Sequence, residues 1–267
     1  MTVSIERTAS QEQRELERLK KELNKLETDL VQHELDLNTL SAELKALDLL
    51  YIRKVGIQLI KLDLIDARIA EILAKLNPED RAAEKRAQEA RKHADEKTEE
   101  VKTAQAAPEE ETQFKPSESL RALYREAAKR IHPDLACDED DRDLRTRWMV
   151  EINAAYQAGN EARLQKLFED WENSPESVQG TGTNADLERM IRKVARAKER
   201  LQEIQKDMER LRNSFAYTLK MRIRAAKKDG RDLLEDMAQK VTKQVERKQT
   251  LLDDLLKNSP PISGIDW

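Results

Sequence analysis

The sequence predicts an all-α protein in which long coiled-coil helices flank one small packed helical module. Charged residues make up 38% of the 267 residues and aromatic residues only 4%, which is too little aromatic volume for one large globular core. Six Gly and seven Pro also provide too few turns for a β-sandwich or barrel, which needs a turn about every 8 to 12 residues. Apolar residues recur instead at the three- and four-residue steps of helices.

An N-terminal arm of heptad repeats is expected over residues 16–78, after a flexible segment at residues 1–15. His33 interrupts the leucine series at a d position, either as a polar residue that sets the register or as a metal ligand or pH switch. We favour the register role, because no second ligand lies at a suitable spacing. The strict repeat ends after Tyr51, so the arm is either one long helix or a helical hairpin bending near Gly56. The leucines of the repeat are Leu16, Leu19, Leu23, Leu26, Leu30, Leu37, Leu40, Leu44 and Leu47.

A charged helical linker is expected over residues 79–113. This segment consists mainly of Ala, Glu, Lys and Arg and carries almost no large apolar side chain. Such a composition is typical of a solvated helix or a semi-rigid spacer. His93 lies among these charges, and we assign it no functional role.

A small packed module is expected over residues 114–174, because six of the ten aromatic residues fall within 58 residues there. Ser117 or Ser119 is a suitable N-cap for its first helix. That helix should end at His132, because the residue before a proline is disfavoured in the α conformation. A second helix and a short third helix follow an acidic turn. The first two helices should form an antiparallel pair that exposes His132 and the two residues after it at its tip.

A second coiled coil is expected over residues 187–257, after a linker at 175–186 and before a non-helical tail at 258–267. Its first helix is basic, since residues 187–231 hold 15 basic and 6 acidic side chains. This helix could bind the phosphates of a nucleic acid or of an anionic membrane surface. We favour pairing with an acidic helix, either antiparallel with the N-terminal arm of the same chain or within a parallel homodimer.

The composition excludes several classes of function. The single cysteine, Cys137, rules out an intramolecular disulfide framework and a cysteine-built zinc site, and its acidic neighbours should leave the thiol unreactive. The sequence contains no P-loop, glycine-rich phosphate loop, nucleophile elbow or metal-ligand cluster, so it predicts no enzyme, cofactor or metal. It shows neither a signal peptide nor a run of about 18 apolar residues, which favours a cytoplasmic protein without a membrane span.

Three motifs stand together in the central module. A basic helix with a tyrosine, LYREAAKRI, runs directly into His132, Pro133 and Asp134 (HPD), and the next helix contains the Asn-Ala-Ala-Tyr element at residues 153–156. An isolated HPD is a weak motif, but its position at the end of a basic amphipathic helix makes the match specific. Over this fifth of the chain, the sequence resembles the J-domain family, the DnaJ-like co-chaperones.

The resemblance implies activation of a DnaK-type chaperone of the heat shock protein 70 class. In J domains the basic helix docks on the chaperone's ATPase region, and the HPD loop promotes ATP hydrolysis there. The hydrolysed nucleotide belongs to the partner, so the histidine is not a catalytic base in this chain. A stripe of charge would speed and orient the encounter. Carried over by position, the docking residues are Arg121, Arg125, Lys129 and Arg130, and the trigger residues are His132, Pro133 and Asp134.

The resemblance is incomplete at both ends of the module. Typical J domains open with a short helix that contains a Tyr and a Leu, and the corresponding span here, PEEETQFKPSE, predicts no helix. Phe114, the third helix or a coiled-coil arm could cover the exposed side instead. The chain also lacks the Gly/Phe-rich linker, the zinc repeats and the β-rich client domain of full-length DnaJ.

Two hypotheses of function follow. In the first, the chain is a specialised co-chaperone whose coiled-coil arms bring a DnaK-type chaperone to a particular client or assembly. In the alternative, it is a structural coiled-coil scaffold or adaptor with a degenerate J-like docking module, and its basic arm contacts nucleic acid.

Overall fold

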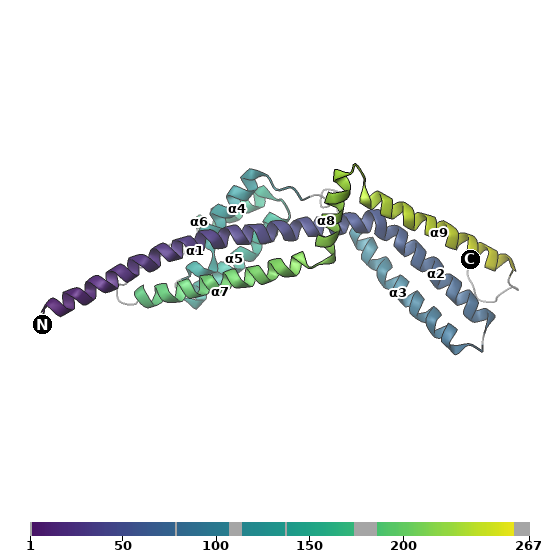
Figure 1. The fold of residues 1–267 in the computed structure, drawn as a ribbon, viewed down its shortest axis with the longest axis horizontal. Coiled ribbons are helices and arrows are strands. Elements are labelled where there is room, and N and C mark those ends of the chain that lie inside the picture. Colours follow the sequence, from purple (N-terminus) through teal and green to yellow (C-terminus); the bar gives the residue numbers. More distant parts are fainter. Residues whose placement is uncertain (1, 78, 107–113, 137, 174–185, 259–267) are drawn as a thin grey trace. The chain divides into compact units, whose positions relative to one another are not determined.

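In the structure, a computed structural model, all regular secondary structure of the described residues is helical (Figure 1). The predicted all-α class with long helical arms is confirmed. Most of the expected linker at 175–186, nearly all of the tail at 258–267, and Cys137 lie outside the described residues. Those described are 2–77, 79–106, 114–136, 138–173 and 186–258.

The chain forms two compact units, and each combines segments that are distant in the sequence. Unit 1 consists of Met1–Leu44 and Phe114–Ser214, and unit 2 consists of Lys45–Gln113 and Phe215–Trp267. The expected division into an N-terminal arm, a linker, a module and a C-terminal arm therefore differs from the observed one, because helices from both arms pack into each unit.

The N-terminal arm is helical from Thr2 to Leu76 and does not fold back. Helix α1 (Thr2–Tyr51) passes into a π-helical turn, η1 (Ile52–Gly56), and then into α2 (Ile57–Leu76). The residues that flank η1 keep right-handed helical torsions, so the chain does not reverse at Gly56. Of the two arrangements left open by the sequence, one long helix is correct, and it begins well before the expected start at residue 16.

In unit 1, α1 pairs with α7 (Asp186–Arg212) through an apolar seam. Figure 1 shows the two helices side by side and running in the same direction. The expected pairing within one chain is therefore present, but it is parallel rather than antiparallel. Basic side chains of α7 meet acidic ones of α1, as in the ion pair of 2.6 Å between Lys198 Nζ and Glu22 Oε1. The buried seam residues are Leu19, Leu23, Leu30, Val194, Ala197 and Ile204.

His33 does not occupy the seam, contrary to the heptad assignment. Its side chain is exposed, while the neighbouring Glu34 is buried. A straight α-helix drifts by about 20° per heptad relative to a strict seven-residue repeat, and α1 also packs against the central module. The buried face of α1 is therefore broader than one seam and extends beyond the a and d positions.

The central module contains three helices: α4 (Glu118–Ile131), α5 (Glu139–Gln157) and α6 (Glu161–Glu172). The Ser117 hydroxyl accepts a hydrogen bond of 3.0 Å from the backbone N–H of Leu120 and thereby caps α4. Helix α4 ends at Ile131 as expected before His132. After α5, Gly159 turns the chain with a φ of 66°, a conformation that favours glycine.

Helix α1 completes the core of this module. Val31 and Leu35 of α1 lie in the same buried cluster as Tyr124, Ile152 and Trp171. No helix is described before α4 in the module, and α1 occupies one side of the module's core instead. The expectation that a coiled-coil arm could cover this side is therefore confirmed for α1.

Polar contacts set the position of α1 along the module. The side-chain amide of Asn38 donates to the Tyr124 hydroxyl at 2.9 Å, and that hydroxyl donates to Asn153 Oδ1 at 2.8 Å. The hydroxyls of Thr39 and Tyr156 also lie 2.8 Å apart. Because buried polar groups need their partners, a shift of α1 by one residue would break this network.

In unit 2, α3 (Arg81–Ala106) folds back against α2, so the described part of the expected linker, residues 79–106, is not a solvated spacer. Ala87 and Ala94 are buried in this hairpin. Asp63 of α2 accepts a hydrogen bond of 3.3 Å from Lys97 Nζ. The interface was missed because α3 contributes small alanines, while the large apolar side chains come from α2.

The C-terminal arm divides between the two units. After α7, helices α8 (Phe215–Lys228) and α9 (Leu233–Asn258) belong to unit 2. Helix α9 packs on α2 through Ile72 and Leu252, and Figure 1 shows these two helices side by side. The sequence repeats at 187–257 thus belong to successive helices with different neighbours rather than to one continuous coiled coil.

Leu35→Ala should lower the free energy of unfolding of unit 1 by about 2–5 kcal/mol, because it deletes buried methyl groups that α1 supplies to the module core. Val150→Ala is the matched control, since Val150 is 62% exposed on α5 and should change stability by less than about 0.5 kcal/mol. Urea unfolding followed by tryptophan fluorescence measures both, because Trp148 and Trp171 lie in the module. Equal stabilities would show that α1 is not part of this core.

Candidate functional site

The HPD loop, His132, Pro133 and Asp134, joins α4 to α5. His132 leaves the α conformation with a ψ of 135°, and Pro133 opens a short 3-10 turn, η3 (Pro133–Leu135). The backbone N–H of Asp134 donates to His132 Nδ1 at 3.1 Å. The loop geometry therefore follows from local sequence: proline ends α4, and the imidazole caps the turn that follows.

The loop is not exposed at the tip of the helix pair, contrary to expectation. His132 is 5% and Asp134 8% exposed, and Pro133 is partly buried. The sequence-based prediction treated the module as isolated, whereas α1 and α7 contribute Glu34, Arg200 and Lys193 to the surroundings of the loop.

Glu34 of α1 is the direct partner of the His132 ring. His132 Nε2 and Glu34 Oε1 are 3.2 Å apart. Since Nδ1 accepts from the backbone of Asp134, the network assigns the ring proton to Nε2, which donates to Glu34. Arg200 of α7 donates to the same Glu34 oxygen from Nε at 3.2 Å and from Nη2 at 3.3 Å. One carboxylate thus joins α1, α7 and the HPD loop.

Lys193 makes a second contact from α7 to the loop region. Its Nζ donates to the backbone carbonyl of Leu135 at 3.2 Å. A small cavity beside this contact is lined by His132 and Asp134 on one side and by Leu30 and Ala197 on the other. Helices α1 and α7 therefore cover the loop with both polar and apolar groups.

The two buried carboxyl groups of the cluster have opposite pKa shifts. Burial alone would raise the pKa of Glu34, but the hydrogen bonds and charges of His132 and Arg200 outweigh it, so the pKa is lowered from its ordinary 4.5. The charge of Glu34 therefore stabilises the fold near neutral pH, and this contribution is lost as the pH falls through the lowered pKa. Burial, assisted by Glu34, raises the pKa of Asp134, although His132, Arg142 and Arg200 oppose the shift.

Two oxygen atoms of this cluster have no hydrogen-bond partner. They are Glu34 Oε2 and Asp134 Oδ2, and both are buried. Asp134 Oδ2 lies 3.6 Å from His132 Nδ1, which is too far for a hydrogen bond. A buried polar atom without a partner costs about 1–3 kcal/mol. The unpartnered oxygen of Asp134 is therefore a cost to the fold.

The four predicted docking residues lie on α4 but not on one face. Arg121 and Arg125 pair with Glu118, at 3.9 and 2.8 Å. Arg130 points towards α6, where it pairs with Glu172 and lies 5.2 Å over the Phe168 ring. Lys129 is exposed and lines the cavity beside the HPD loop. All four are at least partly exposed, and two of the three arginines share one neighbouring carboxylate.

Arg145 of α5 positions the start of the loop, and the sequence analysis missed it. Its side chain is fully buried, donates to the backbone carbonyl of Arg130 at 2.9 Å, and pairs with Asp141 at 2.7 Å. The guanidinium also lies 5.0 Å over the Trp171 ring. A single charged residue thus holds the C-terminal end of α4 to α5 and α6.

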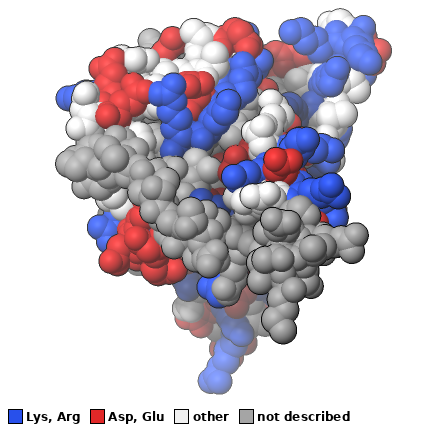
Figure 2. All heavy atoms as spheres, turned by 90° about the vertical axis from the view of Figure 1, so that its left-hand side faces the viewer, with Lys and Arg blue, Asp and Glu red and all other residues white. Residues whose placement is uncertain are grey.

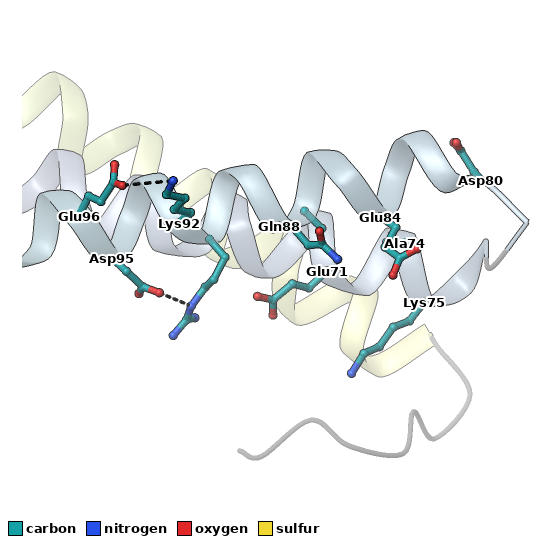
Figure 3. A pocket seen from close by; sticks show the side chains of 11 residues that line it. Glu71, Ala74, Lys75, Asp80, Glu84, Gln88, Lys92, Asp95 and Glu96 are labelled. Atoms are coloured by element: carbon teal, nitrogen blue, oxygen red, sulfur yellow. Dashed lines mark hydrogen bonds and ion pairs between the residues drawn. The ribbon is translucent and has the colours of Figure 1, made fainter.

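Among the described residues, the cleft of unit 2 is not a second centre of this kind. Figure 2 shows basic and acidic side chains next to one another on the face in view. The cleft between α2 and α3 has a volume of about 830 Å³, and Figure 3 shows ion pairs along α3, such as Lys92–Glu96, whose charged atoms lie 3.8 Å apart. Ala87 is its one buried lining residue, so the cleft lacks the buried polar groups that orient a small ligand.

Helix α8 carries the least neutralised positive charge. It contains five basic and no acidic residues. Within the described part of the chain, no ion pair involves Arg222, Arg224, Lys227 or Lys228, and all four are exposed. In contrast, Lys198 and Arg200 of α7 pair with α1, as expected for a basic helix beside an acidic arm.

Comparison with known proteins yields no family model, no curated protein and no solved structure that matches the chain. None of the helices in the described ranges has the length and apolarity needed to cross a membrane. The described residues also hold no group of three or more His, Cys, Asp or Glu side chains suited to a metal ion.

Asp134→Asn should make the chain more stable than wild type near neutral pH. Burial raises the pKa of Asp134, so its charge carries a cost that disappears as the pH falls through the raised pKa towards 3.8. The stability difference should therefore shrink on acidification. Urea unfolding at several pH values measures it, with the exposed Asp143→Asn as the control. A variant less stable than wild type at pH 7 would show that the carboxylate has a structural role.

Arg145→Ala should lower the free energy of unfolding by about 1.5–3 kcal/mol, because it removes the ion pair with Asp141 and the buried hydrogen bond to the Arg130 carbonyl. Arg147→Ala, two positions along α5 and exposed, should have a small effect. Urea unfolding measures the free energy of unfolding of both variants. A loss below about 1 kcal/mol for Arg145→Ala would contradict its role as the clamp on α4.

Proposed function

We propose that the protein is a specialised J-domain co-chaperone that stimulates ATP hydrolysis by a DnaK-type chaperone through its HPD loop. The observation that carries this proposal is the arrangement of α4, η3 and α5. A basic helix with Arg121, Arg125 and Lys129 runs into His132–Asp134, and the next helix returns beside the first, as the hydrogen bond between Tyr124 and Asn153 shows. This is the arrangement that the resemblance to J domains implies.

The unpartnered carboxylate of Asp134 supports a role beyond folding. Its buried oxygen has no hydrogen bond, and the nearby charges of His132, Arg142 and Arg200 do not outweigh the cost of burial, since the pKa of Asp134 stays raised. Each buried unsatisfied group calls for a physical explanation, and a functional requirement is one such explanation. A carboxylate that a partner protein must contact would account for an aspartate at this position.

In this proposal the chain itself carries out no catalysis and binds no cofactor. Arg121, Arg125, Lys129 and Arg130 provide positive charge for docking on the chaperone, and the helical arms bind a client or assembly in the cytoplasm. The ATP and the attacking water belong to the chaperone. His132 acts by contact with that partner and transfers no proton to the nucleotide.

A second candidate function is a structural scaffold in which the HPD sequence serves only to join helices. The burial of His132 and its hydrogen bond to Glu34 favour this alternative. The four exposed cations of α8 would then suit a polyanionic partner such as nucleic acid, whose binding weakens with salt. In a scaffold, substitutions in the HPD loop would change stability and leave chaperone activity untouched.

The decisive experiment measures single-turnover ATP hydrolysis by a DnaK-type chaperone with and without the purified chain. The wild-type chain should raise the rate, and His132→Gln should abolish the increase because the partner loses the imidazole contact. His93→Gln is the matched control, since His93 is exposed on α3. Equal stimulation by wild type and His132→Gln would refute the proposal. Thermal unfolding confirms that each variant is folded.

A further inference from the structure

We propose that Glu34, Lys193 and Arg200 form an autoinhibitory latch that holds the HPD loop in a closed state, in which it cannot reach a partner. The inference rests on the proposed co-chaperone function and assigns a regulation to the same loop. In the open state, α7 moves away from the loop and the Glu34 side chain releases the His132 ring, while α1, α4, α5 and α6 keep their packing.

The latch blocks the residues that a partner would have to touch. Glu34 Oε1 accepts from the His132 ring at 3.2 Å, and the ring has no other polar edge free because Nδ1 accepts from Asp134. Lys193 is bonded to the carbonyl of Leu135 at the end of the same turn. A chaperone and the latch would therefore compete for the His132 imidazole and for the η3 turn.

The latch is weaker than the packing around it. Its contacts are polar, and the side chain of Arg200 is 38% exposed although that of Glu34 is buried. The cluster leaves one buried oxygen unpartnered on Glu34 and another on Asp134. A partly satisfied polar network stabilises less than a fully bonded one, whereas the module core is apolar. The contacts between latch and loop should therefore open before α4, α5 and α6 separate.

Opening needs no new fold, only a shift between two states of unit 1. A partner that binds the free loop favours the open state by its difference in affinity for the two states. The reverse also holds, because a client that draws α7 away from the module would make the loop accessible to the chaperone. Coupling of this kind would restrict the stimulation of ATP hydrolysis to chains whose helical arms have bound a client.

A second ion pair in the same helix pair provides a matched control. Glu22 of α1 and Lys198 of α7 lie 2.6 Å apart, and neither contacts the loop. Glu22→Gln therefore weakens the α1–α7 interface without touching the latch. Glu34→Ala and Lys193→Ala remove latch contacts from α1 and from α7 separately, so an effect shared by both does not come from a packing defect in one helix.

The experiment compares these variants by single-turnover ATP hydrolysis of a DnaK-type chaperone and by the NMR signal of the His132 ring. The chain has three histidines, so ¹⁵N-histidine labelling gives a simple spectrum in which His132→Gln identifies the Nε2–H bonded to Glu34. Glu34→Ala and Lys193→Ala should expose this proton to exchange with water. Each should raise stimulation about tenfold, because a hydrogen bond to a charged group shifts an equilibrium by roughly that factor.

The outcomes separate the latch from the proposed function. Increased stimulation by both latch variants, wild-type behaviour of Glu22→Gln, and no stimulation by the Glu34→Ala/His132→Gln double variant support the latch. Equal, His132-dependent stimulation by all single variants overturns the latch and leaves the co-chaperone proposal standing. An unchanged ring signal in both latch variants also overturns the latch. If the ring is released and no variant stimulates hydrolysis, the co-chaperone proposal fails and the inference fails with it.

Discussion

The burial of one helix, α1, against two different neighbours is the constraint on which unit 1 depends. Val31 and Leu35 complete the core of the module, while Leu23 and Leu30 form the seam with α7. A helix with two buried faces has little freedom to rotate or slide. Because α1 is fixed in this way, Glu34 is brought to His132, and the HPD loop takes its position from a segment about a hundred residues away in the sequence.

Buried polar contacts fix the register between the helices of unit 1, which apolar packing alone leaves undetermined. Leucines repeated every three or four residues permit several registers between helices, and a buried polar residue commonly selects one of them. In unit 1 Asn38 has this role, since it bonds Tyr124 on α4 and accepts from Gln157 on α5 at 2.7 Å. Arg145 has a comparable role between α5 and the end of α4. Both residues make hydrogen bonds that can form only when unit 1 is assembled.

The sequence predicted the local features of the fold and missed those that arise from assembly. Helix class, the cap at Ser117 and the end of α4 before Pro133 depend on a few adjacent residues, and these predictions were confirmed. The exposure of His132 was predicted wrongly, because periodicity within α4 and α5 carries no information about α1 or α7. Nothing in the sequence distinguished Glu34 from the many other charged residues of the N-terminal arm. The packing of α3 was missed because alanines have too weak an apolar signal.

The parallel pairing of α1 with α7 has a consequence for the order of events during synthesis. Glu34 and Arg200 are separated by 166 positions, so the ribosome completes α4, the HPD loop and α5 well before α7 emerges. At about 5–20 residues per second, synthesis from the end of α5 at Gln157 to Arg200 takes on the order of several seconds. A nascent chain therefore presents His132 without the cover of α7, and only a chain that extends through α7 can enclose it as in this structure. Truncation before α7 would permanently preserve this early state.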